Sequence, residues 1–238
     1  LSNHSFAEIN SLESVSNAIF SPDGKHVLFP KQQVAWKNNR YDREIWLAKE
    51  GEEPFQLTNT LEGNSSSPKW SPDGNWISFL SKRDEKTQLH VIRAAGGEAI
   101  QLTHTASTIR GYEWSPRGKT IAFLQAEDKS KEEKKRKEKY GGFSVDDAEY
   151  QLTQLWSIAF DPSSLNRMLL PAQQKDSALK ASMAAKLLID SVDFTISSFE
   201  WSPDGKKIAI QHQPDPLINT FFKADISIYD LASDSLRP

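Results

Sequence analysis

The sequence predicts an all-β fold, and three observations point to it. A five-residue segment recurs four times, as FSPDG at 20–24, WSPDG at 70–74 and 201–205, and WSPRG at 114–118. Each copy lies between short segments in which apolar and polar residues alternate, as they do in strands. The copies begin 50, 44 and 87 residues apart. Four-stranded units that repeat about every 40 to 50 residues are typical of a β-propeller, so we expect a propeller of four-stranded blades.

The repeated segment has the composition of a tight turn. Its Pro presets φ, its Asp accepts hydrogen bonds from nearby amides, and its Gly takes the positive φ that returns the chain to a strand. We therefore expect positive φ at Gly74 and Gly205. The third copy has Arg117 in the Asp position, so the segment requires no carboxylate. A catalytic motif is normally needed only once in a protein. Four copies therefore indicate that the segment has a structural role in each repeated unit.

Two further strands complete each of the first two units. Residues 44–50 and 88–94 (EIWLAKE and QLHVIRA) predict a third strand. Residues 56–60 and 101–105 (QLTNT and QLTHT) predict a fourth.

The third unit is longer because it carries two insertions. Leu155 and Leu188 mark the third and fourth strands of this unit. Their spacing from the turn tryptophans, compared with the spacing in the second unit, places the extra residues at about 127–149 and 172–186. The unit is then a single blade, provided that LLID at 187–190 is its fourth strand.

The four blades are expected to form a partial ring within residues 1–238, beginning near 18, 68, 112 and 199. The chain reaches Pro238 where the fourth strand of the last blade should begin. An unclosed propeller exposes strand edges, so we expect the chain to be part of a longer protein.

The first insertion contains EDKSKEEKKRKEK at 127–139, with seven basic and five acidic residues. Such a charge run predicts a solvated helix or an irregular loop. Contact with nucleic acid or an acidic partner, or a role in guarding a substrate entrance, are the alternatives. The second insertion, at 173–186, is rich in helix formers and predicts a short surface helix.

The composition excludes several classes of protein. Lys and Arg total 29 against 32 Asp and Glu, so the net charge of −3 provides no basic field for nucleic acid. The absence of cysteine excludes disulfides, thiolate metal sites and a cysteine nucleophile, and it fits the cytoplasm and the bacterial periplasm equally. No apolar run approaches the roughly 18 residues that a membrane span needs.

The sequence contains no catalytic, cofactor or metal motif. The nucleophile elbow G-x-S-x-G of α/β-hydrolases is absent. Histidines occur without HExxH or a paired spacing, so we expect surface or structural roles for them, at positions 4, 26, 90, 104 and 212. Trp70, Trp114 and Trp201 recur at one position of the repeat, which predicts packing between blades.

One segment breaks the repeat and is the best candidate for a functional surface. VAWKNNRYDREIW lies between the second and third strands of the first blade. We expect Trp36, Arg40, Tyr41 and Arg43 to contact substrate or another domain. A merely structural role is the alternative, because loops of this composition are common.

The repeat also resembles a known family. WSPDG with ISFLSKR, then QLHVIRAAGGEAIQLTHT and YEWSPRGKTIAFL, resembles the propeller half of the prolyl oligopeptidase family of serine peptidases, particularly its acylaminoacyl-peptidase and dipeptidyl-aminopeptidase-like branches. The resemblance runs from about Ile9 to Pro238. The lysine-rich insertion with KYGGFSVDDAEYQLTQLW is similar to the long third-blade loop of that branch, with Gln151 in place of the usual Arg.

In the resembled family the propeller caps an α/β-hydrolase domain, which carries the Ser, Asp and His, and restricts access to short peptides. The resemblance implies that this chain is a non-catalytic, substrate-gating segment of a serine peptidase acting on short peptides or acyl-peptides. Its implied partners are peptide substrate and a C-terminal hydrolase domain of the same parent protein. The alternative is a TolB-like propeller that binds a protein partner without catalysis.

Overall fold

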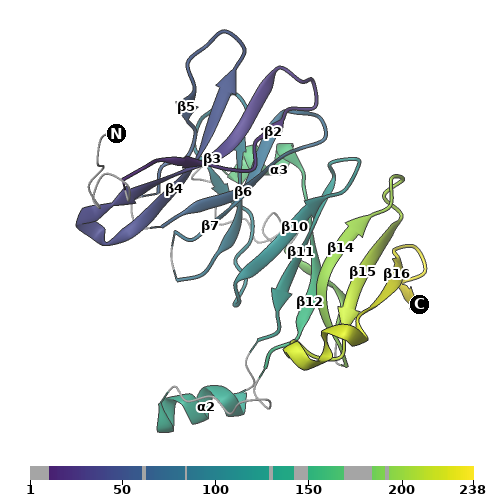
Figure 1. Cartoon of the computed structure of the whole chain (residues 1–238). Helices are drawn as coiled ribbons and strands as arrows, with labels where there is room; N and C mark the ends of the chain where they lie inside the picture. Colours follow the sequence, from purple (N-terminus) through teal and green to yellow (C-terminus); the bar gives the residue numbers. More distant parts are fainter. Residues whose placement is uncertain are drawn as a thin grey trace. The chain divides into compact units, whose positions relative to one another are not determined.

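The computed structural model describes residues 11–60, 63–83, 85–128, 131–141, 150–168, 184–190 and 193–238. The chain divides into two compact units, Leu1–His104 and Thr105–Pro238. Each unit contains two antiparallel sheets (Figure 1), which confirms the all-β class. We refer to the four sheets as blades 1 to 4 in chain order.

Blade 1 has five strands, because two short strands share the first position. They are β1 (Ser14–Val15) and β2 (Ile19–Phe20), and both pair with β3 (His26–Ala35). The 3₁₀ helix η1 (Trp36–Asn38) leads to β4 (Arg40–Lys49), which pairs with β3 and with β5 (Phe55–Gln56).

Blade 2 has the simple four-stranded order β6 (Ser65–Trp70), β7 (Trp76–Ser81), β8 (Gln88–Arg93) and β9 (Ile100–Gln101). Blades 1 and 2 share an apolar core formed by Leu28, Ile45, Leu47, Ile77, Phe79 and Ile92. Trp70 packs against this core, and its Nε1 donates a hydrogen bond to the carbonyl of Ile19 in blade 1 (3.4 Å). The predicted packing between blades is therefore confirmed for Trp70.

Blade 3 consists of β10 (Ile109–Trp114), β11 (Thr120–Ala126), β12 (Thr153–Ala159) and β13 (Lys186–Ile189). The predicted fourth strand at 187–190 thus coincides with β13 to within one residue at each end. The short helix α3 (Pro162–Met168) follows β12. Trp114 is buried and its ring meets that of Phe160 edge to face (4.7 Å between centroids).

The first insertion is helical over α2 (Lys131–Tyr140), which lies beyond the ends of β11 and β12, away from the sheet (Figure 1). The two ends of the insertion are joined just past β11, because the amide of Glu127 donates to the carbonyl of Leu152 (2.8 Å). Gln151 adds a second contact between the two ends of the insertion, because its Nε2 donates to the carbonyl of Glu127 (2.7 Å). The helix predicted at 173–186 lies largely outside the described residues, as does His4.

Blade 4 consists of β14 (Thr195–Trp201), β15 (Lys207–Gln213), β16 (Asp225–Asp230) and β17 (Ser235–Arg237), with the 3₁₀ helix η3 (Ile218–Lys223) between β15 and β16. The expectation that the chain ends before a fourth strand is wrong, because β17 pairs with β16 through Ile228 and Arg237. Trp201 belongs to a core shared with blade 3, which includes Ala122 and Leu155 and confirms its packing between blades.

The four turns have the expected geometry. The glycine amide donates to the serine carbonyl three residues earlier at 2.8 to 2.9 Å in each copy. The φ values are 71° at Gly74 and 70° at Gly205, which confirms the prediction. In three copies the serine hydroxyl donates to the Asp, and this hydrogen bond from Ser202 is the main cause that lowers the pKa of Asp204. These contacts are local, so the turns are architectural elements.

Candidate functional site

The hairpin of blade 1 is longer than that of blade 2. Strands β3 and β4 have ten residues each, whereas β7 and β8 have six. The pair Lys31 and Glu44 corresponds to Ser81 and Gln88, the last pair of the blade 2 hairpin. Four more pairs follow in blade 1, and Asn39 closes the turn with φ of 47°. We call residues 32–43 the hairpin extension.

The hairpin extension carries all four candidate residues, and its two aromatic residues differ from its two arginines in exposure and contacts. Trp36 and Tyr41 are 56% and 57% exposed. Arg40 instead donates from Nη1 to the carbonyl of Gly63 (3.0 Å), and its Nη2 lies 3.4 Å from Asp42 Oδ1. Arg43 donates from Nη2 to Gln32 Oε1 (2.6 Å). The two arginines therefore brace the extension, and the two aromatic rings face solvent.

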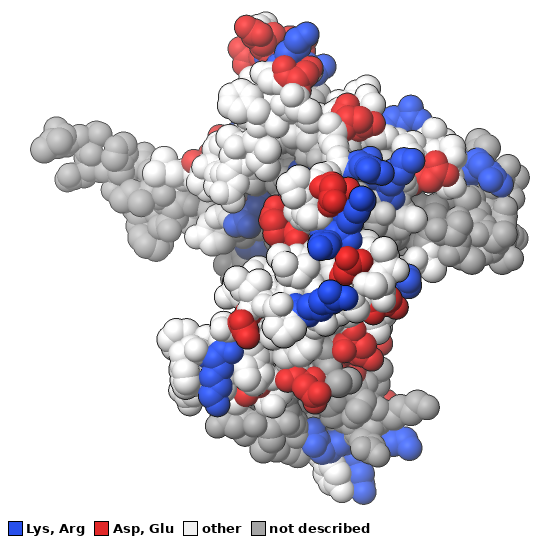
Figure 2. All heavy atoms as spheres, turned by 90° about the vertical axis from the view of Figure 1, so that its right-hand side faces the viewer, with Lys and Arg blue, Asp and Glu red and all other residues white. Residues whose placement is uncertain are grey.

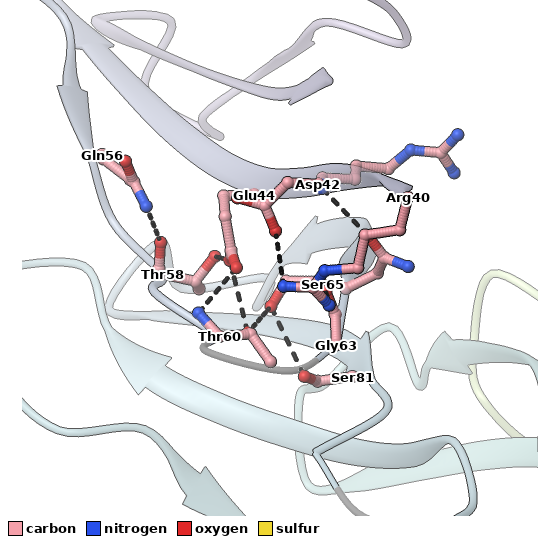
Figure 3. A network of polar contacts seen from close by, with 11 residues as sticks. Arg40, Asp42, Glu44, Gln56, Thr58, Thr60, Gly63, Ser65 and Ser81 are labelled. Atoms are coloured by element: carbon pink, nitrogen blue, oxygen red, sulfur yellow. Dashed lines mark hydrogen bonds and ion pairs between the residues drawn. The ribbon is translucent and has the colours of Figure 1, made fainter. Parts of the chain in front are cut away.

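A buried polar network lies beneath the hairpin extension (Figure 3). Glu44 is buried, with 4% of its surface exposed. Its carboxylate accepts hydrogen bonds from the Thr58 hydroxyl (2.5 Å) and the Thr60 amide (2.6 Å). The Thr60 hydroxyl lies 3.0 Å from Ser65 Oγ, which in turn donates to Ser81 Oγ (3.4 Å). The network joins blade 1 to blade 2, and a buried carboxylate needs such donors.

Blade 2 repeats this contact without the charge. Gln88 Oε1 accepts a hydrogen bond from the Thr103 hydroxyl (2.8 Å), as Glu44 accepts one from Thr58. In both blades the threonine hydroxyl also accepts from the amide of the next strand residue, Leu89 or Ile45 (2.9 Å). The recurring QLT segment therefore joins the third and fourth strands, which is a structural role.

A second candidate site is a cavity of about 430 Å³ in the unit Thr105–Pro238. It is lined chiefly by β10 and β14, two strands that contact each other. Among the described residues each of them pairs on one side only, β10 with β11 and β14 with β15. Both strands also carry a bulge, between Ile109 and Gly111 and between Ile196 and Ser198. Bulges redirect side chains and often lie next to functional sites.

The cavity wall combines the cation of Arg110 and the carboxylate of Glu113 with hydroxyl and apolar groups. Arg110 occupies the bulge of β10, and its Nη1 donates to Thr153 Oγ1 (3.0 Å). Ser197 and Ser198 lie on the opposite strand, β14, and their hydroxyls donate to Gln211 of β15 (3.2 Å each). The apolar lining residues include Leu124, Ile196, Phe199 and Pro216. Such a mixture suits a small ligand with one anionic end.

No motif in the sequence predicted this site. A signal was present, because TIRGYEW at 108–114 and TISSFEW at 195–201 match except where Arg110 and Gly111 replace two serines and Tyr112 replaces a phenylalanine. The arginine therefore departs from the repeat at a position where blade 4 has a small neutral residue. Only the structure shows that β10 and β14 enclose a cavity there.

Figure 2 shows positive and negative side chains interspersed on one face. Within the described ranges no three His, Asp or Glu residues lie close enough to hold a metal ion. None of the helices described has the length and apolar character needed to cross a membrane.

Comparisons with known proteins agree with the architecture. The family model for the TolB β-propeller domain matches residues 4–146. An uncharacterized peptidase of Bacillus subtilis, YuxL, is 28% identical over 149 residues, which are 60% of this chain and 23% of YuxL. Dipeptidyl-peptidase 5 of Porphyromonas endodontalis is 24% identical over 229 residues, which are 90% of this chain and 31% of that protein.

Solved structures share the fold. The Pyrococcus horikoshii acylaminoacyl peptidase matches with a TM-score of 0.60 and 14% identity over 94% of this chain and 32% of its own. The chain thus spans less than a third of the length of each of these three proteins.

Proposed function

Since the chain belongs to the TolB β-propeller domain family, we propose that it is the substrate-gating propeller segment of a serine peptidase. In this proposal the parent protein hydrolyses short peptides or acyl-peptides, and its catalytic Ser, His and Asp lie on a C-terminal α/β-hydrolase domain. The main support is the alignment of 90% of this chain with 31% of a dipeptidyl-peptidase. The absence of G-x-S-x-G from the sequence is consistent with a separate catalytic domain.

The hairpin extension is the proposed contact with substrate or with the hydrolase domain. Exposed Trp36 and Tyr41 offer large, rigid apolar surfaces, which are enriched where proteins bind their partners. Arg40 and Arg43 hold the extension in place through Gly63 and Gln32. A braced extension loses little conformational freedom on binding, and this reduces the entropic cost of an ordered contact.

Gating in this proposal is a matter of access and orientation. The propeller excludes large substrates and presents small ones, while acyl transfer takes place on groups that this chain does not contain. Holding a reactant in a productive orientation lowers the barrier of the step that follows. We therefore expect loss of the propeller contact to reduce kcat/KM rather than to abolish the reaction.

A fluorophosphonate probe, which labels activated serines, tests the proposal. We expect no labelling of the 238-residue chain and labelling of one serine in the parent protein, whose coding sequence beyond Pro238 should contain G-x-S-x-G. Stoichiometric labelling of the 238-residue chain would contradict the proposal. A parent without the elbow and without labelling would instead favour a TolB-like propeller that binds a protein partner.

A further inference from the structure

We propose that the cavity between β10 and β14 binds the C-terminal carboxylate of a short peptide, with Arg110 as the carboxylate-binding residue. The inference rests on the proposed function for the choice of a peptide as ligand. Binding itself needs no hydrolase domain and can be measured on the 238-residue chain. The two proposals can therefore fail separately.

Arg110 has the geometry of an anion-binding residue. Its side chain is exposed at the cavity wall, and Nη1 is held by Thr153 Oγ1 at 3.0 Å. No carboxylate of the described residues lies within 4.0 Å of its guanidinium. Arginine presents its donors as a planar fork that matches a carboxylate with two parallel hydrogen bonds. One anchored nitrogen orients this fork, and within the described ranges no hydrogen bond engages Nη2 or Nε.

The two strands at the cavity can hold an extended peptide backbone. Among the described residues β10 and β14 are the first strands of their sheets, and each has one side without a neighbouring strand. The edge of β14 that faces the cavity offers amide and carbonyl groups to which an extended peptide can add. Ser197 and Ser198 line the same wall, and their hydroxyls donate to Gln211 of β15, so they offer a ligand acceptor oxygens only. A peptide lying on such an edge would direct its C-terminus along the cavity.

The remaining lining residues narrow the class of ligand. Leu124, Ile196, Phe199 and Pro216 provide an apolar surface for a side chain. Glu113 also lines the cavity, and its negative charge opposes the binding of anions, most strongly of those that carry several charges. A volume of about 430 Å³ lies within the range of small-molecule sites, roughly 300 to 1,000 Å³. The expected ligand is a peptide of a few residues with a free carboxylate and an apolar last residue.

The repeat supplies a substitution that should preserve the fold. The residue four positions before the turn tryptophan is Ser66 in blade 2, Arg110 in blade 3 and Ser197 in blade 4. Arg110→Ser therefore places in blade 3 the residue that blade 4 already has at its bulge. Arg117→Gln is the matched control, because it removes one positive charge from the same unit at a residue that does not line the cavity.

The test is a calorimetric or NMR titration of the 238-residue chain with Ala-Ala-Phe as free acid and as C-terminal amide. We expect the wild-type chain to bind the free acid. The wild-type chain should bind the amide at least about tenfold more weakly, and Arg110→Ser should bind the free acid at least about tenfold more weakly, the usual effect of losing a hydrogen-bonded charge. Arg110→Lys should weaken binding less than Arg110→Ser, and Arg117→Gln should change it by less than about twofold.

Three outcomes would overturn the inference. The first is equal affinity of the wild-type chain for the acid and the amide, and the second is unchanged affinity of Arg110→Ser for the acid. The third is tighter binding of inorganic phosphate than of the peptide, which would identify a general anion site. Melting curves of the variants show whether each has folded. A chain that binds the peptide although its parent has no peptidase activity would contradict the proposed function and leave the carboxylate site intact.

Discussion

The Thr58 hydroxyl donates a 2.5 Å hydrogen bond to the buried carboxylate of Glu44, in the place where the Thr103 hydroxyl donates to Gln88. The two contacts have the same position in blades 1 and 2, but only one acceptor is charged. The charge of Glu44 is therefore not required by the geometry of the repeat. Its carboxylate takes two further hydrogen bonds from Thr60.

Replacing Glu44 separates the charge from the hydrogen bonds. Glu44→Gln should lower the free energy of unfolding by no more than about 1 kcal/mol, because an amide can fill this position as in Gln88. Glu44→Ala should lower it by about 1 to 3 kcal/mol more, since the Thr60 amide would lose its buried acceptor. Urea unfolding measures both. Equal losses in the two variants would show that the charge itself is needed.

The glycines of the repeated turn are expected to tolerate no branched side chain. Gly74→Val and Gly205→Val should each cost about 1 to 3 kcal/mol, because φ is near 70° and β-branched residues fit that region poorly. A β-carbon at Gly74 would lie 3.6 Å from Pro22 Cδ, so backbone conformation and not a steric clash is the cause. Thermal melting measures the loss, and an unchanged Tm would contradict this explanation.

The aspartate of the same turn provides the control. Asp73→Asn should have a small effect, because asparagine offers similar turn hydrogen bonds and Arg117 occupies the equivalent place in blade 3. Melting temperature and peptidase activity of the parent protein are measured together. A variant with normal Tm and no activity would reveal a chemical role for the repeated segment.

Helix α2 should be dispensable for stability. Replacing residues 131–140 by a short Gly-Ser linker should change the free energy of unfolding by less than about 1 kcal/mol, because surface insertions add little loop entropy. The flanking residue Glu127 must be kept, since its carboxylate accepts the Leu152 amide (3.0 Å). A loss above about 2 kcal/mol in urea unfolding would show that the segment packs on the blade.

Asp161 should contribute to the acid sensitivity of the fold. Hydrogen bonds from Ser164 and Ser163 lower its pKa from 3.8 to about 2. A carboxyl with a lowered folded-state pKa stabilises the fold above its unfolded pKa, and this stabilisation is lost as pH falls toward 2. The difference in urea midpoint between wild type and Asp161→Ala should therefore shrink from pH 5 to pH 2.

The control for Asp161 is Asp161→Asn, which keeps an acceptor for the Ser163 amide and does not titrate. Its urea midpoint should fall less than that of Asp161→Ala at neutral pH. Its stability relative to Asp161→Ala should also vary little with pH. A difference between wild type and Asp161→Ala that stays constant down to pH 2 would show that the carboxylate has an ordinary pKa.

The exposed aromatic residues of the hairpin extension should affect function more than stability. Trp36→Ala and Tyr41→Ala should each reduce kcat/KM of the parent protein by about five- to thirtyfold, the usual effect of removing an aromatic contact of 1 to 2 kcal/mol. Lys37→Ala, in the same turn, is the control and should have little effect. A lowered Tm with unchanged kcat/KM would assign the two rings a structural role.

Local features could be predicted from the sequence because neighbouring residues determine them. Positive φ at Gly74 follows from turn chemistry, and β13 (Lys186–Ile189) lies within one residue of the strand that the spacing of the repeat predicts at 187–190. The segment containing Trp36 and Tyr41 was noticed because it interrupts the repeat, and its contact with substrate or another domain stays a prediction. Sequence reasoning could not find β17, because SLRP has weak strand character and pairs only when β16 is beside it.

The tertiary structure decided which contacts these residues make. Arg40 and Arg43 look alike in the sequence, but Arg40 reaches Gly63, 23 positions away, and Arg43 reaches Gln32 across the hairpin. Arg110 became a candidate only because β10 and β14 enclose a cavity from segments more than 80 positions apart. Periodicity and turn chemistry act over a few residues, whereas a buried network or a cavity depends on which distant strands the packing of blades brings together.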